Sequence, residues 1–298
     1  MAPTVHFPIY RQYTKARQNA NNAMVSFLAG SALASHTLQL TAGSDRLLPE
    51  IFPAVPHIAR FNLRPDAAAE VLGAAGPHLA TVTIPYALAI HEDFVTQCIR
   101  WIRDTFGFPL PGTVPSITSW NDIDTSNMHE AVVSMTGHRL DSLGSVDLEL
   151  FHVYRLMRNC HIHNGGSVTN ALRRQVRSLS NGAQDRWHKL TRREVDALVR
   201  RDRAEYSLLD VFSVFAVTKG LGRGVNSLLQ AGLTQARWAE VCVDDYRQES
   251  SRTRNSEAWG RGLIGHARDR YSAVGLSKPD LFLAAHAKGA WLDPAKYP

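Results

Sequence analysis

Cysteine is scarce in this chain, whose 298 residues contain only Cys98, Cys160 and Cys242. The three are odd in number, lie far apart and form no Cys-x-x-Cys pair. A small disulfide-stapled fold needs an even set of cysteines, and a zinc ribbon needs closely spaced pairs. The pattern therefore argues against both classes and favours reduced thiols inside a cell.

Long apolar runs are missing as well. The most apolar stretches, residues 24–34 and 208–217, are shorter or more interrupted than the roughly 20 residues that cross a bilayer. The N-terminus also lacks the basic-then-apolar layout of a secretory signal. We therefore expect a soluble, cytoplasmic protein that has no membrane partner.

Acidic residues are outnumbered by basic ones, 27 to 33, which gives a net charge of +6 and a pI near 9.4. The excess is concentrated between residues 155 and 203, a segment with only four acidic residues. Its twelve basic residues are Arg155, Arg158, Arg173, Arg174, Arg177, Arg186, Lys189, Arg192, Arg193, Arg200, Arg201 and Arg203. This electropositive segment fits an acidic partner such as a nucleic acid.

Strand signals and fixed-period repeats are absent from the sequence, and helical periodicity dominates instead. It predicts helices at residues 11–40, 86–106, 126–142, 146–163, 168–179, 192–203 and 208–217, with three or four more over residues 225–287. Six prolines between residues 48 and 85 predict a connector with one short helix at residues 66–72. Residues 221–224, Leu-Gly-Arg-Gly, resemble a glycine-rich phosphate loop without its lysine, and we interpret them as a turn.

These elements predict an all-α protein, an antiparallel helical bundle with additional N- and C-terminal helices. We expect an N-terminal helix and proline-rich connector at residues 1–80. The bundle follows at residues 81–222, and a helical extension occupies residues 223–298.

The densest group of chemically active side chains is the run Arg-Leu-Met-Arg-Asn-Cys-His-Ile-His-Asn-Gly-Gly at residues 155–166. The apolar residues of the preceding helix recur in steps of four and three, which is the seam of a packed helix: Val146, Leu150, Val153, Met157 and Cys160. A second face carries polar residues: His152, Arg155, Asn159 and His163. The two glycines can adopt the left-handed conformation that ends a helix, so His163 is expected in or just past the last turn.

Arginine can bind a phosphate through two parallel hydrogen bonds, histidine can exchange a proton near neutral pH, and asparagine can orient either one. The negative end of the helix dipole favours a protonated imidazole at His163, whereas Arg158 disfavours it. A phosphate bound by Arg158 would offset that repulsion. These residue types together point to chemistry on a phosphodiester, with RNA as the first substrate to consider.

Two plainer interpretations of this run remain. Arg158 and His163 would in one of them merely cap the helix and pair with neighbouring acids. In the other, Cys160, His161 and His163 would bind zinc, but adjacent ligands on one turn point apart and no second cluster completes a tetrahedral set. We therefore expect no metal site and no other cofactor.

This helix end resembles the signature of HEPN domains, which consists of an arginine, a polar residue, three further residues and a histidine. Many HEPN domains are metal-independent ribonucleases of toxin–antitoxin, abortive-infection and CRISPR defence systems. The match consists of Arg158, Asn159 and His163. Arg155 and His161 also have a permitted spacing, but Leu156 stands where the family usually has a polar residue, so we treat these two as accessory residues.

The resemblance implies a homodimer in which two Arg/His sets face one cleft, together with an antitoxin or regulatory protein as a further partner. It implies that His163 helps the ribose 2′-hydroxyl attack the phosphate or protonates the leaving oxygen. Arg158 then stabilises the developing charge and Asn159 holds the geometry.

Five arginines close to the signature are candidates for contacts with the RNA backbone: Arg173, Arg174, Arg177, Arg192 and Arg193. Trp187 and His188 lie between them in the sequence and are candidates for stacking on bases. A solvated basic face without any RNA is the alternative interpretation.

A function of a different class also fits these features. The chain would then be a catalytically inactive helical regulator that binds a nucleic acid or a protein, with a helix-turn-helix at about residues 259–287. Cleavage of RNA in EDTA that depends on His163 distinguishes the enzyme from such a regulator, which would retain duplex DNA without cutting it.

Overall fold

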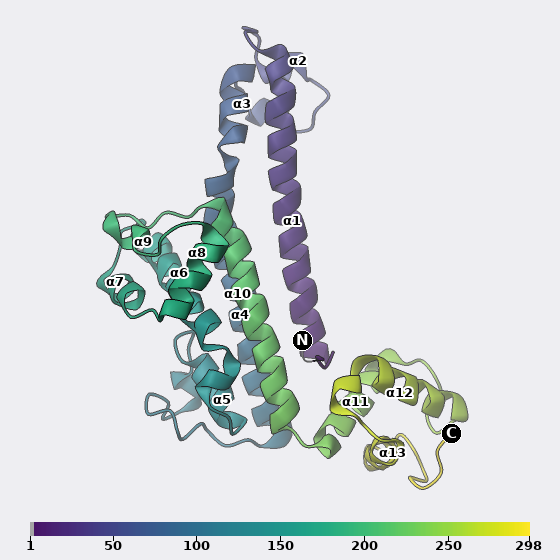
Figure 1. The fold of residues 1–298 in the computed structure, drawn as a ribbon. Helices are drawn as coiled ribbons and strands as arrows, with labels where there is room; N and C mark the ends of the chain where they lie inside the picture. The colour runs from purple at the N-terminus through teal and green to yellow at the C-terminus, as the bar shows by residue number, and fades with distance from the viewer. Residues whose placement is uncertain (1–2) are drawn as a thin grey trace. The chain divides into compact units, whose positions relative to one another are not determined.

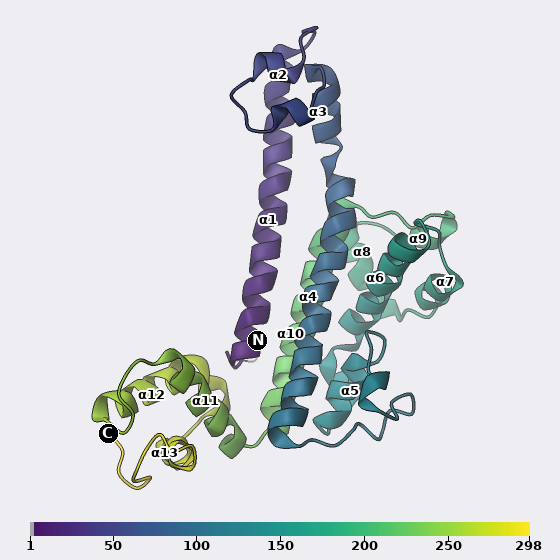
Figure 2. The ribbon, with the colours of Figure 1, turned by 180° about the vertical axis from the view of Figure 1, so that it is seen from behind.

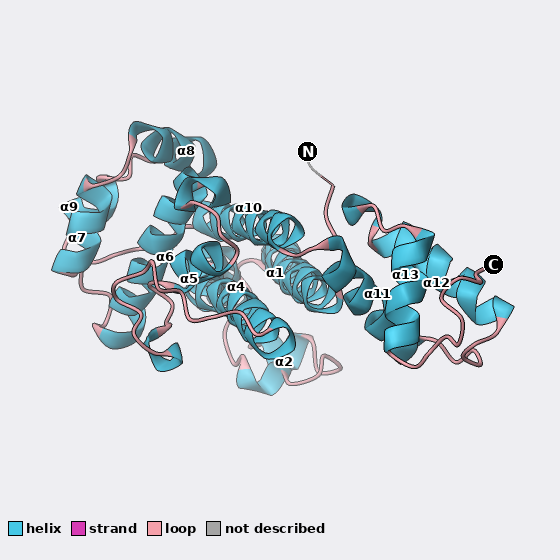
Figure 3. Ribbon diagram, turned by 90° about the horizontal axis from the view of Figure 1, so that it is seen from below, coloured by secondary structure: helices cyan, strands magenta, loops and turns pink. Residues whose placement is uncertain are grey.

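The fold was analysed in a computed structural model that describes residues 3–298. Within this range the protein has thirteen α-helices and no β-strand, and its one β-type contact is an isolated bridge between Ser167 and Arg203. Figure 3 shows helices joined by loops throughout. The predicted all-α class is therefore confirmed.

The helices follow one another in this order: α1 (Pro8–Leu38), α2 (Leu48–Ile51), α3 (Pro65–Gly73), α4 (Ala75–Phe106), α5 (Met128–Met135), α6 (Ser145–His163), α7 (Asn170–Arg177), α8 (Asn181–Thr191), α9 (Ala197–Arg200), α10 (Leu208–Gly232), α11 (Gln235–Glu249), α12 (Glu257–Arg270) and α13 (Lys278–Ala287). The long first helix and the helix that carries the signature lie where periodicity predicted them.

Several local predictions are wrong. The connector ends earlier than expected, because α4 begins at Ala75 and runs through Pro85 without stopping. The helix expected at residues 192–203 is reduced to α9, and an unpredicted helix, α8, precedes it. The Ser180 side chain caps α8 by accepting a hydrogen bond from the Ala183 amide, and Arg192 ends the helix in the left-handed conformation.

The predicted turn at residues 221–224 is instead part of α10. Its glycines allow neighbouring segments to approach: a Cβ atom at Gly224 would lie 2.7 Å from the carbonyl oxygen of Leu143, and one at Gly222 would overlap the ring of Tyr13. Glycine lowers intrinsic helix stability, but here close packing compensates for that loss. The glycine-rich stretch is therefore a packing surface.

The chain forms two compact units, each built from separate parts of the sequence. The terminal unit contains residues 3–16, 89–148 and 217–298, and the motif unit contains residues 17–88 and 149–216. The boundaries expected after residues 80 and 222 lie inside α4 and α10.

A buried carboxylate organises the terminal unit. Asp245 on α11 accepts hydrogen bonds from both Nη atoms of Arg11 at 2.8 Å, from the Tyr271 hydroxyl at 2.8 Å and from His266 Nε2 at 3.1 Å. Burial raises the pKa of Asp245, but the hydrogen bonds from Arg11, His266 and Tyr271 outweigh it and lower the pKa well below its usual range. The carboxylate thus joins the start of α1 to α11 and to the end of α12. Trp238 and Trp259 are almost fully buried nearby.

In the motif unit, α7, α8 and α9 lie beside α6 in both Figure 1 and Figure 2. A cluster of apolar residues joins the end of α1 to α2 and α3 through Leu38, Leu48 and Ala68. The Ser35 hydroxyl on α1 also donates a hydrogen bond to the Ala69 carbonyl on α3, at 2.9 Å.

No single helix among residues 3–298 is long and apolar enough to cross a membrane. Helices α3 and α4 taken together meet the length and hydropathy requirement, but they are bent by 41° at their junction.

Candidate functional site

Helix α6 presents the signature residues at its C-terminal end. Its predicted seam is confirmed, because Leu150, Val153, Met157 and Cys160 have no exposed surface and Val146 is half-buried. The fully buried neighbours Phe151 and Tyr154 make the buried face wider than that seam. A helix anchored this firmly holds its last turn in a fixed place.

The end of α6 is closed as its two glycines predict. Gly165 and Gly166 have φ angles of 57° and 88°, in the left-handed region that glycine adopts at little cost. The Cys160 carbonyl accepts hydrogen bonds from the amides of Asn164 at 3.1 Å and Gly166 at 2.9 Å. His163 is therefore the last helical residue, and its side chain is exposed.

Arg158 and Asn159 are half-buried one turn earlier. Arg158 Nε donates to the Asn159 side-chain oxygen at 3.4 Å, so the amide orients the guanidinium. The Asn159 carbonyl accepts from the Asn164 side chain, also at 3.4 Å. Asn159 thus contacts Arg158 through its side chain and Asn164 through its carbonyl.

The accessory residue His161 is held by an aromatic contact. Its ring stacks on Tyr206, with centroids 4.2 Å apart and planes 18° from parallel. Burial lowers the pKa of His161, a hydrogen bond with the Ala204 backbone acts against this, and the charge of Arg203 lowers it further. His161 is accordingly neutral at pH 7 and fixed in place.

Residues 202–206 form a strap over the end of α6, which no local pattern predicts. The Val168 amide donates to the Asp202 carbonyl and the Ala204 amide to the Gly166 carbonyl, both at 2.8 Å. Arg203 Nη2 also donates to the Gly165 carbonyl at 3.1 Å. The strap thereby holds the Gly-Gly turn, and with it the position of His163.

Tyr206 connects this strap to the arginine of the signature. Burial raises the pKa of Tyr206 above its usual range, the Asp210 carboxylate adds to the effect, and the positive charge of Arg158 opposes it. The charge of Arg158 on α6 thus acts on the hydroxyl of Tyr206 in the strap.

The polar side chains of α6 are less evenly exposed to solvent than their helical spacing predicts. Its residues become more exposed toward the helix end: His152, Arg155 and Asn159 are half-buried and His163 is exposed. Burial lowers the pKa of His152 to about 4, and the charge of Arg155 adds to the effect. His152 therefore remains neutral at physiological pH and belongs to the interior side of this face.

The five arginines proposed for RNA binding fall into two groups. Arg174, Arg177 and Arg192 are exposed. Arg173 instead donates to the Val199 carbonyl at 2.7 Å, and Arg193 Nη2 contacts both Asp210 oxygens, at 2.7 and 2.5 Å. Because Asp210 is fully buried, Arg193 serves as its counter-ion.

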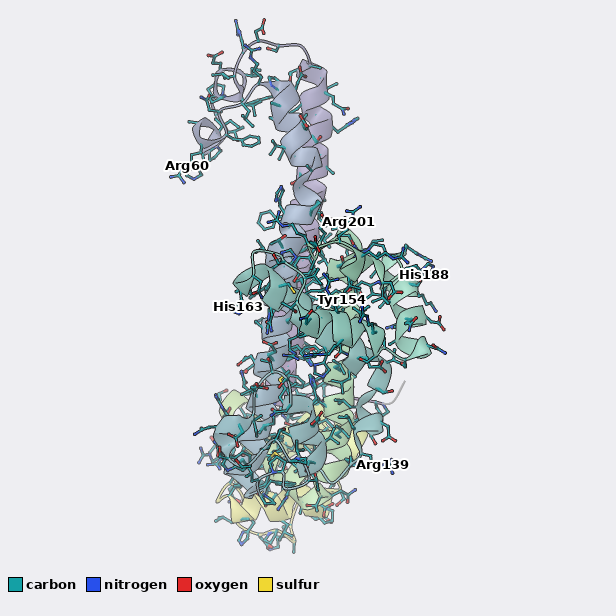
Figure 4. The ribbon with its side chains drawn as sticks, turned by 90° about the vertical axis from the view of Figure 1, so that its left-hand side faces the viewer. Arg60, Arg139, Tyr154, His163, His188 and Arg201 are labelled. Atoms are coloured by element: carbon teal, nitrogen blue, oxygen red, sulfur yellow. The ribbon has the colours of Figure 1, made fainter. Side chains whose placement is uncertain are left out.

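The expectation that Trp187 stacks on bases is wrong. Its ring is fully buried and lies 5.2 Å from the Tyr154 ring, centroid to centroid. His188 is exposed, and its Nδ1 lies 3.1 Å from a Glu194 carboxylate oxygen. Figure 4 shows His163 and His188 on different sides of the motif unit, with Tyr154 between them.

Metal-ligating side chains do not gather at this site. Among residues 3–298 no three His, Cys, Asp or Glu side chains are placed to hold one ion. Cys160 is buried in the seam, with its Sγ 3.7 Å from the Thr169 hydroxyl, whereas His163 is exposed. The three candidate ligands of the signature therefore have separate environments.

Comparison of the chain with protein-family models, curated proteins and solved structures gives no match. The chemistry of the site thus rests on its own geometry. A half-buried arginine oriented by an amide and an exposed histidine at one helix end can bind a phosphodiester and move a proton beside it.

Proposed function

We propose that the protein is a metal-independent endoribonuclease of the HEPN type. The observation that carries the proposal is the end of α6, where the Asn159 side chain orients Arg158 and the glycine turn leaves His163 exposed. Glycine at both positive-φ positions and a strap over the turn keep this end rigid, as a catalytic site requires.

Each residue has a defined role in the proposed reaction. His163 accepts the proton of the ribose 2′-hydroxyl or gives one to the 5′-oxygen that leaves. The 2′-oxygen forms a bond to phosphorus while the bond to the 5′-oxygen breaks, which leaves a 2′,3′-cyclic phosphate and a 5′-hydroxyl. Arg158 stabilises the negative charge that develops on the phosphorane, and Asn159 keeps the guanidinium in place.

The reaction needs both a base and an acid, and each chain supplies one exposed histidine at this helix end. A second chain with its own Arg158 and His163 completes the pair in the homodimer that the resemblance implies. The proposed role belongs to a defence or toxin–antitoxin system, with an antitoxin or regulatory protein as the restraining partner.

Exposed arginines of the same unit extend the proposed RNA surface. Arg174 and Arg177 on α7 and Arg192 at the end of α8 can contact phosphates without breaking any contact described above. Arg173 and Arg193 act in the fold instead, through Val199 and Asp210.

The test is cleavage of a single-stranded RNA by purified protein in EDTA. We expect cleavage with cyclic-phosphate ends, and we expect His163→Ala or Arg158→Ala to lower the rate by roughly 100-fold or more, as loss of a general acid–base or a charge-stabilising group does. His78→Ala is the matched control, because His78 is also an exposed histidine of the motif unit and has no proposed part in the site.

Far-UV circular dichroism of all three variants should match the unmodified protein. An unchanged rate in either signature variant contradicts the proposal, as does cleavage that EDTA abolishes. Retention of duplex DNA without RNA cleavage would favour the regulator instead.

A further inference from the structure

A polar cavity lies in the terminal unit, between the end of α11, the loop that follows it and α12. Its volume is about 330 Å³, near the lower end of the roughly 300–1,000 Å³ typical of ligand sites. Most of the residues that line it carry a hydroxyl, an imidazole, a guanidinium or a carboxylate. The cavity contains no residue of the signature, which belongs to the motif unit.

His266 of α12 is held firmly at the wall of this cavity. Its side chain is 8% exposed, and its Nε2 donates to the Asp245 carboxylate at 3.1 Å. The rings of Tyr246 and Tyr271 lie beside the imidazole, with centroids 5.4 and 5.8 Å away. The Nδ1 atom of His266 forms no hydrogen bond with any residue from 3 to 298 and is not sealed from solvent. A largely buried imidazole thus presents one free nitrogen to the cavity.

Two hydrogen-bond donors converge over Gly262 in the same cavity. A Cβ atom at this position would overlap the Tyr246 hydroxyl and would lie 2.6 Å from Arg252 Nη1. Glycine weakens the interior of a helix, but here it leaves room for both donors. Tyr246 is 8% exposed, and its hydroxyl has no hydrogen-bond partner among the described residues. Because buried polar groups are nearly always paired, this hydroxyl indicates a partner from outside the chain.

Arg252 is anchored in the loop and still keeps donors for a ligand. Its Nη1 donates to the Ala258 carbonyl at 2.8 Å, and its amide donates to the Ser250 hydroxyl oxygen at 3.2 Å. A guanidinium carries five N–H groups, so most of them remain available. The Ser251 hydroxyl lies exposed at the same wall and is a further donor.

The charges around the cavity favour an anion. Among residues 3–298, Glu249 is the only carboxylate that lines it, and its oxygens accept from Arg11 at 2.8 Å and from Arg270 at 2.6 and 2.7 Å. Asp245 behind the cavity is also paired with Arg11. With Arg252, three arginines surround two carboxylates, so this group of charges has an excess of +1. A cation therefore finds no unpaired carboxylate here, whereas an anion meets free donors.

We propose that this cavity binds a phosphate group, as free phosphate or as part of a small monoester. Guanidinium, hydroxyl and imidazole donors from three separate segments suit a tetrahedral oxyanion, and charge-assisted hydrogen bonds of this kind are strong. Arg252 and Tyr246 donate to phosphate oxygens. One proton joins the phosphate to Nδ1 of His266, whether it starts on the ring or on the phosphate. Asp245 keeps the imidazole in place through Nε2.

This site is independent of the proposed ribonuclease activity. Arg158 is also expected to bind a phosphate, so binding is measured in the full chain that carries Arg158→Ala. Failure of RNA cleavage would leave the proposed cavity site untouched. An empty cavity would in turn leave the ribonuclease assignment untouched.

Isothermal titration calorimetry with inorganic phosphate provides the test, in about 0.15 M potassium chloride to screen exposed charges. We expect one site per chain. Tyr246→Phe or Arg252→Ala should raise Kd about tenfold or more, as loss of a hydrogen bond to a charged group does. Arg254→Ala is the matched control and should leave Kd unchanged, because Arg254 is an exposed arginine of the same loop that does not line the cavity.

NMR of histidine-labelled protein locates the bound ion. The ring signal of His266, identified by its loss in His266→Gln, should shift when inorganic phosphate is added. This shift should disappear in Arg252→Ala. The ring of His286 in the same unit contacts the Trp291 carbonyl instead, and its signal should stay in place.

Binding that neither Tyr246→Phe nor Arg252→Ala weakens would overturn the proposal, as would an unshifted His266 signal. Equal weakening by Arg254→Ala would show non-specific attraction to the loop and would overturn it as well. Acetate that binds more tightly than phosphate would assign the cavity to carboxylates and reject it. Phenyl phosphate distinguishes the two sources, since tighter binding than inorganic phosphate supports a monoester and weaker binding supports the free ion.

Discussion

At the residue scale, arginines a few positions apart have different roles. Arg174 and Arg177 lie on the exposed face of α7, whereas Arg173 on the same helix donates to the Val199 carbonyl. Arg193 contacts Asp210, which has no exposed surface and also accepts from the amide and hydroxyl of Ser207. The role of each arginine follows from what its guanidinium faces.

Removing the counter-ion of Asp210 should destabilise the folded protein. We expect Arg193→Ala to lower the free energy of unfolding by about 3 kcal/mol, because a buried carboxylate is left without its cation. Arg177→Ala, at an exposed position, should change it by less than about 0.5 kcal/mol. Urea unfolding followed by circular dichroism measures both, and equal unfolding midpoints would refute this role of Arg193.

At the element scale, a few polar contacts fix the ends of helices. The strap at residues 202–206 holds the end of α6 through backbone hydrogen bonds and the stacking of His161 on Tyr206. In the terminal unit, Asp245 connects α1, α11 and α12. Both arrangements join segments that are distant in sequence, so each constrains the fold more than a local cap does.

The Asp245 network predicts a pH dependence. A folded pKa below the unfolded value means that the stabilisation is complete above about pH 4 and is lost as the pH falls through the lowered folded pKa. At pH 7, Asp245→Asn should therefore lower the free energy of unfolding by about 3 kcal/mol. The difference from the unmodified protein should shrink between about pH 4 and pH 2.

Denaturant unfolding at a series of pH values measures this difference. Asp244→Asn is the control, because Asp244 is adjacent on α11 but 41% exposed. A difference for Asp245→Asn that stays constant with pH would show that the carboxylate charge is not responsible.

At the scale of the whole molecule, the net charge of +6 is unevenly spread. Basic residues accumulate between residues 155 and 203, whereas residues 18–44 carry no Asp, Glu, Lys or Arg. The basic region suits a polyanion such as RNA. The proposed RNA site thus lies in the electropositive part of the motif unit.

The proposed RNA surface should make binding depend on salt. With the His163→Ala variant as a non-cleaving background, we expect log Kd for a single-stranded RNA to rise linearly with log salt concentration. Replacing Arg174, Arg177 and Arg192 by alanine should reduce the slope by about 2, at roughly 0.7 per phosphate contact. Fluorescence anisotropy over a range of potassium chloride concentrations measures the slope.

Alanine at Arg254, Arg261 and Arg268 removes the same charge from exposed positions of the terminal unit. This control should leave the slope nearly unchanged. A flat salt profile of the background protein, or equal slopes for the two triple variants, would count against the proposed surface.

Local pattern was enough to predict several elements. Periodicity located α1 and α6, and the seam from Leu150 to Cys160 is buried as predicted. The glycines at 165 and 166 end α6 with positive φ, because that conformation is intrinsic to the residue. The exposure of His163 follows from the same turn.

By itself, then, the sequence determined the helical class, the buried face of α6 and the place where that helix ends, since these depend on residues within a few turns of one another. Tertiary structure alone decided that Trp187 is buried, that Arg193 pairs with Asp210 and that residues 202–206 cover the end of α6. It also decided that glycines 222 and 224 pack inside a helix instead of forming a turn. The physical reason is that these features depend on contacts between distant segments, and local periodicity carries no record of which segments meet.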